Sequence, residues 1–130
     1  PSAEWMGEFV EKHLQNKQIL ICTDDLDWVK SQDTFKDDKY NISETRIYYD
    51  IPVMIGGGSY AKSLVPYYDL CLMSLCNGAI IANSSLSWWG AWLQSAPNKK
   101  IVSQDPWYGT KLASNDTKDL YPKSWIVEKI

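Results

Sequence analysis

The sequence predicts an α/β fold: a Rossmann-like parallel sheet with helices on both faces. Short apolar runs at Gln18–Thr23, Ala79–Ala82 and Lys100–Ser103 have the length and composition of buried parallel strands. Segments in which apolar residues recur at helical spacing alternate with these runs, as they do in βαβ units. The chain of 130 residues shows no repeat, low-complexity tract or internal linker. We therefore expect one domain over residues 1–130.

Four helices are expected around these strands. The first spans Ser2–Asn16, where apolar residues recur every three or four positions and the serine is placed to cap the helix. The second follows an acidic pair and covers about Asp25–Gln32. The third begins near Pro66 and ends at an Asn-Gly pair, and the fourth spans Ser84–Gln94.

The remaining segments carry weaker signals. Asp33–Ser43 is polar and charged, which predicts a surface connection. Thr45–Asp50 and Trp125–Val127 are candidate strands. The triple glycine Gly56–Gly58 predicts a flexible loop, because it lacks the G-x-G-x-x-G spacing of a dinucleotide-binding turn.

Composition excludes several classes of function. A net charge of -3 argues against a nucleic-acid surface, which needs clustered Lys and Arg. No apolar run approaches the length of a membrane span, so the chain is expected to be soluble. Cys22, Cys71 and Cys76 are expected to be buried free thiols in a reducing interior. With the single His13 they make no zinc set, and no metal is expected.

Polar residues follow two of the predicted strands. Asn83-Ser84-Ser85-Leu86-Ser87 leads one strand into a helix, and such a start offers free N–H groups and a positive dipole end to an anion. The serine at position 84 could equally be only a cap. Likewise, Asp24 or Asp25 could act as a general base or cap the following helix, and the spacing does not decide between these roles.

The stretch that follows is rich in tryptophan. Trp88, Trp89 and Trp92 surround the small residues Gly90 and Ala91. Two interpretations remain open. The segment is either a wholly buried helix, whose small residues admit the close approach of a neighbour, or an aromatic wall of a binding site.

The ordered string DLCLMSLCNGAIIANSSLSWWGAWL, from Asp69 to Leu93, resembles the C-terminal signature of the α-1,2-fucosyltransferases. These enzymes transfer fucose from GDP-fucose to a galactose hydroxyl. The TDD at Thr23, Trp28, and the KKIVSQDPWY and YPKSWI segments occur in the same order as in that family. The resemblance implies the C-terminal donor-binding domain of a GT-B-like, metal-independent, inverting glycosyltransferase.

The resemblance also implies roles for individual residues. Asp69 would accept hydrogen bonds from guanine, although it could instead simply complement the start of its own helix. Ser84 and Ser85 would contact the diphosphate, while Asn83 and Ser87 would order the turn. Asp24 and Asp25 would lie near the nucleotide pocket. The resemblance identifies no catalytic base.

One motif of the family has no match in these residues. The family carries an upstream His-x-Arg-Arg-x-Asp sequence, whereas His13 is expected at the surface of a helix and Arg46 is the only arginine. We therefore expect a fragment that lacks the N-terminal half. It should bind GDP no better than about millimolar, and turnover by this chain alone should be negligible.

The function of the chain has two alternatives, and the resemblance also implies its substrates. The chain could be a non-catalytic nucleotide-binding or interaction module of this fold, or a fucosyltransferase of different linkage. The full enzyme would use GDP-fucose and a galactose-containing acceptor. Self-association through exposed aromatic residues such as Trp88 or Trp107 is possible. A bacterial cytoplasmic location is favoured, with the Golgi lumen as the alternative for a eukaryotic source.

Overall fold

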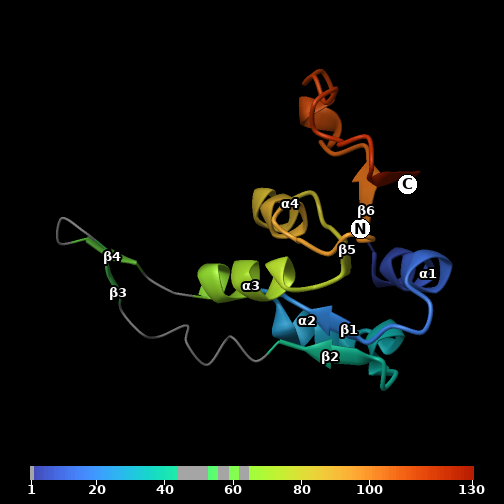
Figure 1. Cartoon of the computed structure of the whole chain (residues 1–130), viewed down its shortest axis with the longest axis vertical. Coiled ribbons are helices and arrows are strands. Elements are labelled where there is room, and N and C mark those ends of the chain that lie inside the picture. Colours follow the sequence, from blue (N-terminus) through green and yellow to red (C-terminus); the bar gives the residue numbers. More distant parts are fainter. Residues whose placement is uncertain (1, 44–52, 56–58, 62–64) are drawn as a thin grey trace.

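A computed structural model describes residues 2–43, 53–55, 59–61 and 65–130 of the chain (Figure 1). Its helices are α1 (Ala3–His13), α2 (Leu26–Ser31), α3 (Val65–Ser74) and α4 (Ser85–Trp92), with short 3-10 helices η1 (Asp33–Lys36) and η3 (Thr110–Leu112). Its strands are β1 (Ile19–Ile21), β2 (Tyr40–Ile42), β3 (Val53–Ile55), β4 (Ser59–Ala61), β5 (Gly78–Ile80), β6 (Lys100–Asp105) and β7 (Ile126–Lys129).

The strands form two parallel sheets and one antiparallel hairpin. β1 pairs with β2, and Ile19 lies opposite Tyr40. β6 lies between β5 and β7, and Val102 is opposite Ile80 on one side and Ile126 on the other. β3 and β4 pair antiparallel. The predicted α/β class with parallel strands is confirmed, but the described strands do not form one continuous sheet.

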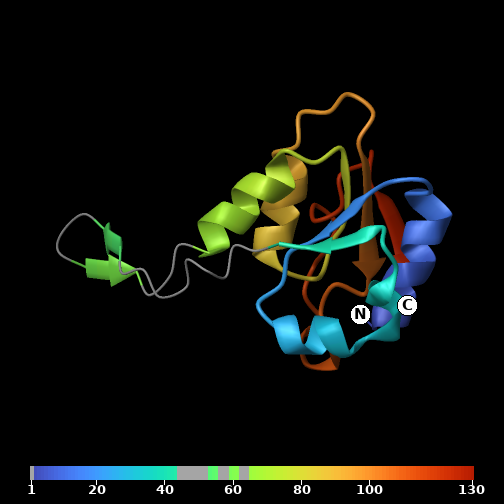
Figure 2. The same ribbon diagram turned by 90° about the horizontal axis from the view of Figure 1, so that it is seen from below.

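Helices cover both faces of the parallel strands, as the sequence predicts. α3 and α4 pack against each other on one face, and α1 lies on the opposite face, in contact with η1, β5 and β6 (Figures 1 and 2). Ser2 caps α1 by accepting a hydrogen bond from the Trp5 N–H at 3.2 Å. The layers are therefore helix, strands and helix, the arrangement of a doubly wound fold.

The main core joins α4 and the three-stranded sheet to the C-terminal part of the chain. It consists of Ile81, Ala91, Ile101, Trp107 and Trp125. β6 is the most buried strand, since its residues from 101 to 104 are all buried. Such burial of a short strand on both faces is what its continuous apolar run predicts.

The predicted connection Asp33–Ser43 is wrong in part. It contains η1 and the strand β2, which pairs with β1 through a hydrogen bond of 2.8 Å from the Ile19 N–H to the Lys39 C=O. Apolar Tyr40 and Ile42 alternate with polar neighbours there, which is the pattern of an edge strand inside a charged segment. The predicted strand Thr45–Asp50 and the loop Gly56–Gly58 lie outside the described residues.

The predicted full burial of the first strand is also wrong. Leu20, in the middle of β1, is 38% exposed, and Ile19 and Ile21 are only partly buried. The physical reason is that, in the part of the chain that the structure describes, β1 has a neighbouring strand on one side only, so part of its apolar surface faces an open space.

Three further side-chain predictions require correction. Cys71 is exposed, although all three cysteines are free as expected. His13 is not a surface residue, because its side chain is only 13% exposed and contacts Glu128 of β7 at 2.7 Å. Trp107 is buried rather than exposed, since its ring packs against Tyr121.

Candidate functional site

The candidate site lies where the parallel strands end. Parallel strands end at the same edge of their sheet, and ligands of doubly wound folds bind at this carboxyl edge. Thr23–Asp25 follows β1, Ser43 follows β2 and Asn83–Ser85 follows β5. An amide hydrogen bond of 3.1 Å from Asn83 to the Trp107 C=O joins the loop after β5 to the loop after β6.

The start of α4 has the geometry of an open helix N-terminus. Ser84 is the N-cap residue, with extended backbone angles, but its side chain makes no capping hydrogen bond. Its carbonyl accepts the first helical hydrogen bond, from the Trp88 N–H at 2.9 Å. Ser85 is exposed in the first turn. These residues leave the first-turn N–H groups of α4 able to meet an anion.

The acidic pair after β1 includes a helix cap. The Asp25 carboxylate accepts a hydrogen bond of 2.9 Å from the Trp28 N–H, and the Thr23 hydroxyl accepts one of 3.0 Å from the Asp25 N–H. Asp24 is exposed beside it. The spacing leaves open whether these aspartates act as a general base or as a helix cap, and the structure shows Asp25 as the cap of α2.

Asp69 lies beneath the surface. It is 6% exposed, and the Ser43 hydroxyl lies 3.4 Å from its Oδ1. Burial, followed by the nearby Asp69 carboxylate and Cys76, raises the pKa of the Cys22 thiol to about 12. Asp69, Ser43 and Cys22 thus gather between α3 and the ends of β1 and β2.

The tryptophans divide between packing and exposure. Trp88 donates a hydrogen bond of 2.8 Å from its indole to the Leu120 C=O and stacks on Trp92 at 5.3 Å between ring centroids. It also packs against Trp125. Trp89 and Trp92 are 52% and 49% exposed. The helix is therefore not wholly buried, and Trp88 serves to hold the C-terminal segment against α4.

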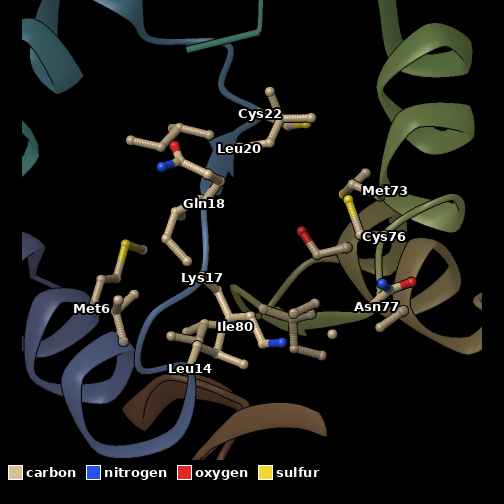
Figure 3. Close-up of a pocket in the computed structure, with 18 of the residues that line it drawn as sticks. Met6, Leu14, Lys17, Gln18, Leu20, Cys22, Met73, Cys76, Asn77 and Ile80 are labelled. Carbon is tan, nitrogen blue, oxygen red and sulfur yellow. The ribbon is translucent and has the colours of Figure 1, made fainter. Parts of the chain in front are cut away.

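Ser87 is partly buried, as Ser84 is, whereas Ser85 is exposed. Ser87 lines a cavity of about 410 Å³ between β1 and β5, which we call the inter-strand cavity (Figure 3). The lining is mostly apolar and includes Leu14, Ile19, Ile80 and Ala91. This cavity was not predicted from the sequence, although the sequence shows the apolar residues of both strands that line it.

Neither a metal cluster nor a spanning helix is found in the described ranges. No three His, Cys, Asp or Glu residues gather there as a metal site would require. None of the described helices has both the length and the apolar character for crossing a bilayer.

Comparison with known proteins places these features in a family. A sequence model of glycosyl transferase family 11 matches residues 3–129. The chain is 29% identical over 118 residues to the O-antigen biosynthesis glycosyltransferase WbnK of Escherichia coli, covering 91% of this chain and 32% of the relative. It is 27% identical over 122 residues to an alpha-1,2-colitosyltransferase of Escherichia coli, covering 93% of this chain and 36% of the relative.

The chain thus spans about a third of the length of these relatives. No solved structure matches it.

Proposed function

Because this chain belongs to glycosyl transferase family 11, we propose that it is the C-terminal, donor-binding domain of a GT-B-like enzyme that transfers fucose from GDP-fucose to a galactoside hydroxyl. The family match over nearly the whole chain is the observation that carries this proposal. The names of the two relatives support sugar transfer, and that of the second supports an α-1,2 linkage. Colitose is the alternative sugar, since that relative's name specifies it.

The diphosphate of the donor would bind at the start of α4. Two serines stand there, Ser84 with a hydroxyl that caps no N–H group of the helix and Ser85 exposed in the first turn. A helix N-terminus favours an anion by roughly 0.3 to 2 kcal/mol, and each charge-assisted hydrogen bond adds about 1.5 to 3 kcal/mol. Asn83 would hold this loop in place through its bond to the Trp107 carbonyl.

Guanine would be selected by Asp69. A carboxylate can accept hydrogen bonds from both N–H donors of the guanine edge, whereas the adenine edge would leave it facing an acceptor. In the chain without a donor, Asp69 is buried next to Ser43. Binding would therefore require the residues that cover the carboxylate to move, which is a reason to expect weak affinity.

The reaction of the full enzyme would be a direct displacement. The acceptor hydroxyl would attack the anomeric carbon of fucose, the bond from that carbon to the diphosphate oxygen would break, and the configuration would invert. The residues of this chain would bind and orient the leaving GDP, and they need no metal in this proposal. The proposal assigns the general base to no residue of this chain.

A nucleotide titration followed by amide NMR shifts tests the proposal. GDP should bind at about millimolar dissociation constant, GMP more weakly because it lacks the second phosphate, and ADP at least about tenfold more weakly than GDP. Asp69→Asn should remove the preference for GDP over ADP while retaining diphosphate binding. Ser84→Ala combined with Ser85→Ala should weaken GDP and ADP together.

Asp27→Asn is the matched control, since it neutralises an exposed carboxylate on α2 that takes part in none of the proposed contacts. Circular dichroism melting of each variant establishes that the fold is retained. If no nucleotide shifts any amide at concentrations of several millimolar, the donor-binding proposal is wrong and a non-catalytic interaction module is favoured. If GDP and ADP bind equally, the role of Asp69 is wrong.

A further inference from the structure

The inter-strand cavity lies between two strand edges that face each other without pairing. Among the described residues, β1 pairs only with β2, and β5 pairs only with β6. Both strands nevertheless line the same space of about 410 Å³. Folded domains contain few spaces larger than a water molecule, so an apolar space of this size between two unpaired strand edges is unusual.

The peptide groups at these two edges point into the cavity. On β1, the Ile19 N–H and the Ile21 C=O bond to the β2 side, at 2.8 Å each. Alternate residues of a parallel strand bond to opposite neighbours, so the peptide groups of Leu20 and Cys22 face the other way. On β5, the Ile81 N–H bonds to Val102 of β6, and the peptide group of Ile80 therefore faces the cavity.

Apolar side chains close the cavity from both faces of the sheet. Met6 and Leu14 come from α1 on one face, whereas Met73 and Cys76 lie at the end of α3 on the other (Figure 3). A strand placed between two helix layers must be apolar on both faces. The walls of the cavity thus specify an occupant with the composition of a central parallel strand.

A buried acceptor in the wall supports this. Gln94 is 4% exposed and lines the cavity. Its Nε2 donates to the carbonyls of Met73 and Gly78, at 2.9 Å and 3.2 Å. Its Oε1 is buried and has no hydrogen-bond partner in the structure. Buried polar atoms are rarely left unpaired, and an occupant that carries N–H groups would satisfy this oxygen.

The direction of α1 tells which segment would fit. Leu14, just after α1, lies 3.5 Å from the Cβ position of Gly78, at the amino end of β5. The first turn of α1 lies at the opposite end of the strands, on the same side as the arrowhead of β6 (Figure 2). A strand parallel to β5 would end there, within reach of α1 through the short loop usual between a strand and a helix.

We infer that the inter-strand cavity is the place of a β-strand that leads directly into α1 and pairs in parallel with β1 on one side and β5 on the other. The strand order becomes β2, β1, new strand, β5, β6, β7. With the β3–β4 hairpin left out of the count, these strands numbered along the chain have the order 3-2-1-4-5-6, the order of the Rossmann fold. A right-handed connection through α1 to β1 accompanies it, and β1 runs obliquely to β6, as the twist across an intervening strand requires (Figure 2).

Amide hydrogen exchange on two versions of the chain tests this inference. One is the chain itself, and the other carries before Pro1 an extension of about eight residues, mostly valine and isoleucine, ending in a short Gly-Asn linker. Segments 19–22 and 78–82 should exchange rapidly in the chain itself and at least about tenfold more slowly in the extended chain. Residues 101–104 of β6, already buried in the sheet, should change little between the two.

A matched extension with proline at alternate positions is the control, because proline cannot donate to a strand ladder. It should leave segments 19–22 and 78–82 unprotected. Three results would overturn the inference: no added protection from the valine-rich extension, equal protection from the proline extension, or protection already complete in the chain itself. In the last case, size-exclusion chromatography separates pairing of two copies, seen as a dimer, from closure of β1 onto β5 within a monomer.

Discussion

A buried carboxylate, that of Asp69, and a partly buried thiol, that of Cys22, lie close together at the carboxyl edge. Cys22 follows β1, and its thiol pKa rises from the ordinary 9.0 to about 12, mainly through burial and secondarily through the Asp69 carboxylate. Only the thiolate is a strong nucleophile, so the fraction of Cys22 that can react near pH 8 falls by on the order of 10³-fold. Cys71, on the outer face of α3, is exposed.

Alkylation should therefore distinguish the cysteines. We expect iodoacetamide near pH 8 to modify Cys71 rapidly and Cys22 very slowly, as followed by peptide mass spectrometry over time. Asp69→Asn removes one cause of the raised pKa, so Cys22 should react faster in that variant. Asp24→Asn should leave its rate unchanged. Rapid alkylation of Cys22 in the unaltered folded chain would contradict the placement of this thiol.

At the scale of elements, α3 and α4 approach closely at one glycine. A Cβ built on Gly90 would lie 2.8 Å from the Met73 Cβ and 3.1 Å from its sulfur. The first of these contacts involves an atom fixed to the α3 backbone, so rotation of the methionine side chain cannot relieve it. The helix pair is thus held together at a point where only glycine fits without displacement.

Gly90→Ala should lower the free energy of unfolding by about 1 to 3 kcal/mol, the usual cost of overpacking, although alanine favours a helix more than glycine does. Urea denaturation followed by tryptophan fluorescence measures this change in the free energy of unfolding. Gly109→Ala is the control: no atom lies within 4 Å of its Cβ position, and its φ of -66° suits alanine. That variant should be neutral or slightly stabilised, and an equal loss in both variants would refute close helix contact as the cause.

The elements also show what the sequence could and could not predict. β5, β6 and α4 were predictable because each is a continuous local pattern: an apolar run for the strands, and an open serine turn followed by apolar residues for the helix. β2 was missed because Tyr40 and Ile42 stand among charged residues, and their strand conformation depends on pairing with β1. An edge strand of three residues leaves too weak a pattern to be read without its partner.

The candidate site divides in the same way. Local spacing predicts the serine turn before α4, and it gives capping as one of two possible roles for Asp25, the one that the structure shows. The burial of Asp69 depends on Ser43, 26 residues away, and that of His13 on Glu128, 115 residues away. Contacts at such separations leave no local pattern, which is why the sequence did not predict the burial of Asp69 and placed His13 at the surface.

At the scale of the whole molecule, ion pairs connect the two ends of the described chain. Lys12 and His13 at the end of α1 contact the Glu128 carboxylate of β7, at 2.5 Å and 2.7 Å. These contacts span 116 and 115 residues. They fix α1 against the three-stranded sheet, and so they help to hold the wall of the inter-strand cavity that α1 provides.

This connection predicts how stability depends on pH. Hydrogen bonds from Lys12 first, and His13 second, lower the pKa of Glu128 from its ordinary 4.5 in the folded chain. A carboxyl group whose pKa is lowered on folding stabilises the folded state above its ordinary pKa, and it loses that contribution as pH falls through the lowered value. Glu128→Gln should therefore reduce the melting temperature by a few degrees at neutral pH, and the difference should shrink steadily below about pH 4.5.

Thermal melts at a series of pH values, followed by circular dichroism, measure this difference. Glu8→Gln, which neutralises an exposed glutamate on α1, is the matched control and should show no such dependence. High salt should reduce the neutral-pH difference, because exposed ion pairs are screened. The melting temperatures of Glu128→Gln and of the unaltered chain could instead differ by the same amount at neutral pH and at pH values well below the ordinary pKa of glutamate. That result would mean that the glutamate acts through packing. In that case its charge would not be what ties α1 to β7.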